Sequence, residues 1–150
     1  MKEKKYIIES LMDYILTCPY LEKLNKFGLN FLDKDSENYS VEEVPSKNVI
    51  KKRVDGSYEK QLIFIFASIF DYSDELENQI KNSGFYEDFE DWLEENNDNE
   101  VFPDLKAGLT PISVEVETSG YLYGINESMN KARFQIQCKL IYEKEGRIKW

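Results

Sequence analysis

The chain has 150 residues, of which 41% are hydrophobic and 14% aromatic, and its formal net charge is −10. This length and composition predict a single domain over 1–150 with its own hydrophobic core, rather than a disordered chain. The acidic balance argues against sequence-specific nucleic acid and against a membrane surface as partners, because both recognise clustered basic side chains.

Two residue types limit the chemistry further, since the sequence contains no histidine and only two cysteines. Without histidine, the commonest general base and metal ligand are missing, which excludes Ser-His and Cys-His catalysis and most zinc sites. Glu9 and Asp13 interrupt the first apolar stretch, so we expect no signal peptide and a protein made in the cytoplasm. In that compartment Cys18 and Cys138 are expected to be buried thiols rather than a disulfide.

The first half of the chain predicts one helix followed by short strands. Apolar residues recur at three- and four-residue spacing over 3–17, which predicts an amphipathic helix that ends at Cys18-Pro19. Asp55-Gly56 is a turn signal between strand-like residues. We expect three short extended segments before this turn, at 27–32, 38–44 and 48–54.

The segment 58–70 predicts the central strand of the sheet. Its residues are apolar on both alternating faces, so both faces need to be covered. We expect the N-terminal helix on one face and either the following acidic segment or a neighbouring protomer on the other.

The following segment, 71–100, holds twelve acidic side chains and a single basic one, Lys81. Its net charge is therefore −11, and the rest of the chain sums to about +1. The aromatic and leucine side chains within it predict a buried stripe under a negative outer face. This predicted stripe consists of Phe85, Tyr86, Phe89, Trp92 and Leu93. Ser83-Gly84 and a shift of the apolar phase predict two helices or one sharply kinked helix.

Two alternating segments, 112–123 and 131–142, predict a C-terminal hairpin. If Tyr123 pairs with Lys131, Glu115 faces Lys139 and Glu117 faces Gln137, which brings opposite charges together. The whole pattern predicts an α+β fold, in which an N-terminal helix and a central kinked or paired acidic helix pack a mostly antiparallel sheet.

No catalytic, cofactor-binding or metal site is predicted. The carboxylates of 87–95 lack the turn glycine and loop geometry of a calcium site, and the glycines are too isolated for a phosphate loop. Such a run predicts a solvated or partner-facing surface instead. The candidate assembly residues on it are Glu87, Glu90, Asp91 and Glu94.

Lys51, Lys52 and Arg53 form the only basic triplet. Two interpretations stay open for it. The triplet can protect an edge strand against unwanted pairing, or it can complement the acidic helix of a neighbouring copy.

Five stretches of the sequence together resemble a known family. They are TCPYL at 17–21, VDGS at 54–57, NSGFYEDFEDWLEE at 82–95, TSGYLY at 118–123 and ARFQIQCKLIYEKE at 132–145. This combination resembles small head–tail proteins of tailed phages and prophages from low-GC Gram-positive bacteria, which are often described as minor capsid proteins.

The resemblance implies a virion protein of the tail-terminator or tail-completion type. Such proteins form a ring of identical subunits, commonly a hexamer, at the neck of the virion. The ring caps the head-proximal end of the tail tube and binds the tube protein and the head–tail connector protein. The sheath protein is a further partner that the resemblance allows, and the family supplies no catalytic residues.

Two alternatives accompany this interpretation. The first is another head–tail connector or stopper component. The second is an acidic protein that mimics DNA and inhibits a host nucleic-acid enzyme, which the charge of 71–100 motivates.

Overall fold

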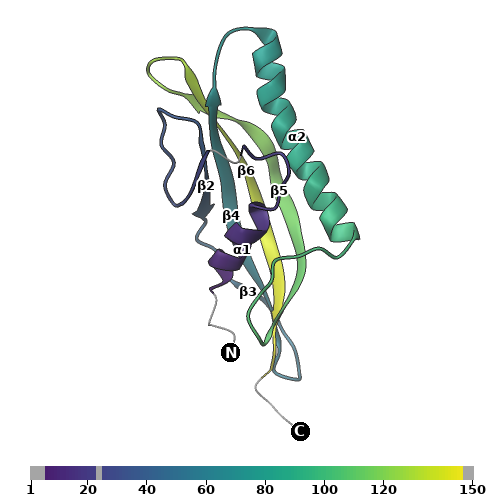
Figure 1. The fold of residues 1–150 in the computed structure, drawn as a ribbon. Helices are drawn as coiled ribbons and strands as arrows, with labels where there is room; N and C mark the ends of the chain where they lie inside the picture. The colour runs from purple at the N-terminus through teal and green to yellow at the C-terminus, as the bar shows by residue number, and fades with distance from the viewer. Residues whose placement is uncertain (1–5, 23–24, 147–150) are drawn as a thin grey trace.

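The structure, a computed structural model, describes residues 6–22 and 25–146. Residues 3–5 of the predicted first helix lie outside this range. The described residues form two helices and six strands (Figure 1). In chain order these are α1 (Ile7–Ile15), β1 (Lys26–Leu29), β2 (Asn38–Glu43), β3 (Val49–Lys52), β4 (Tyr58–Asp71), α2 (Leu76–Asp98), β5 (Leu109–Ile125) and β6 (Lys131–Lys144). The predicted α+β class is confirmed.

The strands form one sheet in the order β1-β2-β4-β6-β5, with β3 paired to the start of β4. All pairs are antiparallel except β1–β2. β4 and β6 remain in register from Tyr58↔Lys144 to Asp71↔Lys131 without a shift. β4 is therefore central, as its two-sided apolar pattern predicts.

Both helices pack on the same face of the sheet (Figure 1). The ring of Phe89 in α2 stacks on that of Phe66 in β4, with 4.8 Å between the ring centroids. The rings of Tyr14 in α1 and Trp92 in α2 are also in contact, with their centroids 5.2 Å apart. Buried aromatic pairs of this kind contribute roughly 0.5–1.5 kcal/mol each beyond the area that they bury. The expectation of one helix on each face is thus wrong.

Long polar side chains, rather than a helix, lie on the opposite face. Gln135 and Arg133 of β6 are the register partners of Ala67 and Ile69 of β4, and these two β4 residues are buried. Arg133 also pairs with Glu42 at 2.8 Å. The hydrocarbon stems of such side chains can cover apolar surface, and here their polar ends have protein partners, since Gln135 donates to the Tyr121 hydroxyl at 2.8 Å.

The break predicted at Ser83-Gly84 is absent, because α2 is one continuous helix. The apolar phase shifts there for another reason: Leu76 and Ile80 do not face the core and are 70% and 61% exposed. Glycine inside a helix costs only about 1 kcal/mol relative to alanine. The packing of the following turns is enough to override that cost.

The C-terminal hairpin forms with a different register from the predicted one. Glu115 pairs with Lys139 as expected, but β5 shifts against β6 at four points. Thr118 therefore takes the place opposite Gln137, and Gly124 pairs with Arg133, so the expected Tyr123–Lys131 pairing is wrong. Such bulges insert extra residues and bend the strand.

Candidate assembly interface

The outer surface of α2 carries the negative charge. We call its exposed carboxylates the acidic face: Glu77, Glu87, Asp88, Asp91, Glu94, Glu95 and Asp98. Within residues 6–22 and 25–146, none of them forms a salt bridge. Glu90 differs, since it is half-buried and accepts a hydrogen bond from the Ser119 hydroxyl at 2.8 Å.

The inner surface of α2 is the predicted apolar stripe. Tyr86, Phe89 and Leu93 are buried, while Phe85 and Trp92 are partly buried against the core. The Tyr86 hydroxyl lies 2.7 Å from the Ser68 hydroxyl and donates to the Phe134 carbonyl at 3.1 Å. Burial raises the pKa of Tyr86 well above its usual range, so the phenol stays neutral as a structural group.

Gly120 of β5 allows α2 to approach the sheet this closely. A Cβ atom at this position would lie 2.5 Å from the Cβ of Tyr86. Three segments of the family resemblance, 82–95, 118–123 and 132–145, therefore meet around the ring of Tyr86. They form one packing unit rather than separate surface features.

Two asparagines fix the C-terminal end of α2. The Asn97 side chain donates to the Val114 carbonyl at 2.9 Å and accepts from the Val114 N–H at 3.1 Å, so it pairs with the backbone of β5. Asn96 donates to the Tyr14 hydroxyl at 3.0 Å, and that hydroxyl donates to the Val101 carbonyl at 3.1 Å. The acidic face thus stands on a helix joined to both β5 and α1.

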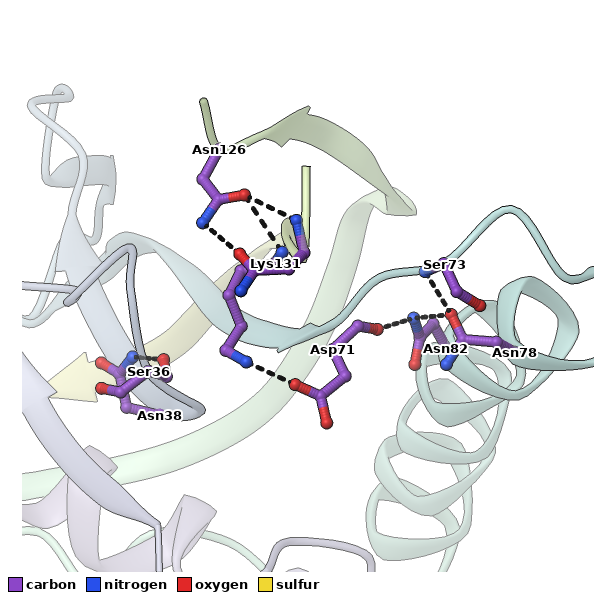
Figure 2. A network of polar contacts seen from close by, with 9 residues as sticks. Ser36, Asn38, Asp71, Ser73, Asn78, Asn82, Asn126 and Lys131 are labelled. Atoms are coloured by element: carbon purple, nitrogen blue, oxygen red, sulfur yellow. Dashed lines mark hydrogen bonds and ion pairs between the residues drawn. The ribbon is translucent and has the colours of Figure 1, made fainter. Parts of the chain in front are cut away.

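Figure 2 shows how the other end of α2 is fixed near the end of β4. Asn82 donates to the Asp71 carbonyl at 2.9 Å, and Asn78 accepts from the Ser73 N–H at 3.1 Å. The Asp71 carboxylate forms an ion pair with Lys131 of β6 at 2.6 Å. This hydrogen-bonded pair lowers the pKa of Asp71 and raises that of Lys131.

The basic triplet lies elsewhere. Lys51 and Lys52 are exposed on β3, which flanks β4 on the side away from β6 and β5. Arg53 pairs with Glu59 at 3.6 Å and with Glu143 at 3.2 Å. The structure therefore separates Lys51, Lys52 and Arg53 from the acidic face within one subunit, and it occupies Arg53 in ion pairs with β4 and β6.

Other chemistry finds little support in the described residues. Among them, no group of three or more metal-ligating side chains is placed to hold a metal ion. Cys18 and Cys138 are free and buried, as predicted, and burial raises the pKa of Cys18 to about 11. Burial also raises the pKa of Cys138, so neither thiol is activated. None of the helices that the structure describes is long and apolar enough to cross a membrane.

One cluster was missed by sequence reasoning. Lys60, Lys106 and Lys144 line a single pocket, although they are far apart in the chain. The alternation of β4 and β6 places Lys60 and Lys144 on one face, but only the long-range pairing of these strands brings the two together.

The comparisons with known proteins add no family to this description. No protein-family model and no curated protein matches the chain.

Proposed function

We propose that the chain is a structural protein of a tailed-phage or prophage particle. In this proposal a ring of identical subunits, a hexamer as the resemblance implies, caps the head-proximal end of the tail tube. The ring also joins the tube to the head connector at the virion neck, with the sheath protein as a further partner in a contractile tail. The function comes from multivalent contacts and involves no catalysis.

The observation that carries this proposal is the shared packing of the resemblance segments. Segments 82–95, 118–123 and 132–145 meet around Tyr86, so the stretches that resemble the phage family are parts of one structural unit. That unit holds the acidic face outward on a fixed helix. A rigid charged surface of this kind suits recognition between protein subunits, since little order has to be imposed on binding.

The separation of opposite charges is a second support. The acidic face lies on α2, which contacts β5 at one edge of the sheet. Lys51 and Lys52 lie on β3, and β4 and β6 stand between β3 and β5. Two different surfaces of one subunit can meet in a heterologous contact, which closes into a ring when the rotation allows. The second interpretation of the basic triplet, a complement to a neighbour's acidic helix, is retained here for Lys51 and Lys52.

Deletion of the gene from a phage that carries it tests the proposal. Electron microscopy is expected to show tails of uncontrolled length that fail to join heads, and a plasmid copy is expected to restore both properties. A deletion phage with normal-length tails joined to heads would contradict the proposal.

The alternative of a connector or stopper component is tested by gene order, because a terminator gene is expected just upstream of the tube genes and a stopper gene nearer the portal gene.

A DNA mimic is the second candidate function. The observation that favours it is the acidic face, whose carboxylates form no salt bridge with another described residue, on a helix in which Lys81 is the only basic residue. This function predicts that the protein captures one nucleic-acid enzyme from host extract and inhibits it. Charge reversal at Glu87, Glu90, Asp91 and Glu94 is expected to abolish that inhibition, while capture of tail proteins instead would count against the mimic.

A further inference from the structure

The half-buried lysines of the described chain fall into two groups. Lys131 and Lys139 have carboxylate partners, Asp71 at 2.6 Å and Glu117 at 3.9 Å. The remaining three are Lys60, Lys106 and Lys144, and they line one pocket. Within residues 6–22 and 25–146, none of these three ammonium groups forms a salt bridge.

Three parts of the fold build this lysine pocket. Lys60 of β4 and Lys144 of β6 project from the helix-covered face, where Tyr142 is the register partner of Lys60. Lys106 comes from the turn before β5, in which Gly108 adopts a φ of +87°. The pocket has a volume of about 290 Å³, close to the lower limit for small-ligand sites. Ile7, Leu109 and Tyr142 give it apolar walls.

The charges in the lysine pocket are poorly balanced. Burial lowers the pKa of Lys60, and the neighbouring charges of Lys144 and Lys106 lower it further. Among residues 6–22 and 25–146, Glu145 is the only carboxylate residue that lines this pocket, against three ammonium groups. A bound anion would relieve this repulsion and interact with several lysines at once.

We propose that the lysine pocket is a binding site for an anionic phosphate or carboxylate group. The group can belong to a small free anion or to a carboxylate side chain of a second copy. The acidic face supplies carboxylates for the second source, and these form no salt bridge within the part of the chain that the structure describes. The proposal does not rest on the tail function, because the pocket binds the same chemistry in either case.

Titration of the full-length protein with pyrophosphate tests the site. The lysine side-chain signals are followed by NMR, and chloride keeps the ionic strength constant. Saturable shifts are expected for Lys60, Lys106 and Lys144, with Lys51 and Lys52 unchanged. Shifts that are uniform over all lysines, or that never saturate, overturn the proposal.

Substitutions locate the binding. The double variant Lys60→Gln/Lys144→Gln is expected to bind pyrophosphate at least about tenfold more weakly, since the loss of even one charge-assisted hydrogen bond is worth about 1.4 kcal/mol or more, which is tenfold in affinity. The matched control Lys51→Gln/Lys52→Gln carries the same charge change and is expected to bind like the wild type. Equal weakening in both variants overturns the assignment to this pocket.

Thermal melting gives a second measurement on the same proteins. Pyrophosphate is expected to raise the Tm of the wild type, and at the same concentration to raise that of Lys60→Gln/Lys144→Gln much less. In the single variant Lys106→Gln, on the turn before β5, pyrophosphate is expected to raise the Tm less than in the wild type. This variant tests the proposal if the double variant does not fold. A full rise in Lys106→Gln and in any folded double variant contradicts the proposal.

Sedimentation velocity separates the two sources of the anion. Pyrophosphate that dissociates oligomers of the wild type identifies a carboxylate of the second copy as the occupant. Concentration-independent monomers that bind pyrophosphate identify a free anion instead.

Discussion

The two parts of α2 differ in what lies beneath them and in what they present to solvent. In the first turns Leu76 and Ile80 are exposed, and Asn82 provides the contact with the end of β4. In the following turns Tyr86, Phe89 and Leu93 are buried, and the outer side is acidic. The same helix therefore carries an apolar surface with little packing beneath it and an acidic surface with a buried aromatic base.

This difference indicates which part of α2 is suited to rigid recognition. Carboxylates on a helix whose underside is packed keep fixed positions, whereas the first turns depend on hydrogen bonds at the end of a strand. Substitutions in each part of α2 test whether the two parts differ in this way.

Phe89→Ala is expected to have the largest effect. Phe89 is fully buried and stacks on Phe66, so the substitution is expected to cost about 3–5 kcal/mol of unfolding free energy. Leu76→Ala, at an exposed position in the first turn, is the control and is expected to change stability by less than about 0.5 kcal/mol. Urea denaturation followed by circular dichroism measures both, and equal losses would show that the two parts of α2 are packed alike.

Asn97→Ala is expected to have the next largest effect. It removes both hydrogen bonds to the Val114 backbone, and leaving such groups unpaired costs about 1–3 kcal/mol. Asn99→Ala, at an exposed position just after the helix, is the matched control. Amide hydrogen exchange at Val114 should accelerate in Asn97→Ala and not in Asn99→Ala. Unchanged exchange in Asn97→Ala would show that this contact does not protect the Val114 amide.

Gly84→Ala is expected to stabilise the protein by about 1 kcal/mol. A Cβ atom at Gly84 meets no other atom within 4 Å, and the residue lies inside the helix. Thermal melting should therefore show a higher Tm. A lower Tm would indicate that α2 bends at Gly84 after all.

The smallest effect concerns the pH dependence of stability at the end of β4, where Asp71 pairs with Lys131. The hydrogen bond from Lys131 lowers the pKa of Asp71 in the folded protein. Ionised Asp71 therefore stabilises the fold at pH above its unfolded pKa of about 3.9, and this stabilisation is lost as the pH falls through the folded pKa. The effect is small because the Asp71 side chain is 64% exposed. Asp71→Asn should therefore flatten the loss of stability on acidification.

The pKa of Glu37 is shifted in the opposite direction from that of Asp71, so its ionisation has the opposite effect on stability. Burial raises the pKa of Glu37, and the hydrogen bond and charge of Asp71 raise it further. Ionised Glu37 therefore opposes folding once pH rises above its unfolded value of about 4.3. Glu37→Gln should make the protein slightly more stable at pH 7, as measured by urea denaturation, and a loss of stability there would contradict the sign.

The sequence predicts the features of this molecule that depend on local pattern. Alternation identifies β4 and the two C-terminal strands, and helical spacing identifies the stripe of Tyr86, Phe89 and Leu93. The break at Ser83-Gly84 was wrong because local propensity is weaker than the packing on either side of it. The hairpin register was wrong because bulges in β5 are fixed by contacts such as that of Gly120 with Tyr86, which lie far apart in sequence.

The candidate site was predicted to a similar extent. An outward acidic face follows from charge and helical period alone, so Glu87, Asp91 and Glu94 were found. Glu90 and Arg53 were also predicted to be assembly residues, but each has a partner within the subunit. Ser119 of β5 donates a hydrogen bond to Glu90, and Arg53 forms ion pairs with Glu59 and Glu143. These contacts and the lysine pocket depend on strand pairing over long separations, which a single sequence does not specify.

The most direct test of the central claim, that the acidic face is an assembly surface, is complementation of a phage that lacks this gene. The variant Glu87→Gln/Asp91→Asn/Glu94→Gln neutralises three carboxylates of the acidic face, and Glu22→Gln/Asp35→Asn/Glu127→Gln neutralises three exposed ones outside α2. With both variants folded like the wild type by circular dichroism, the first is expected to leave heads and tails unjoined and the second to restore particles. Normal particles from the first variant would contradict the claim.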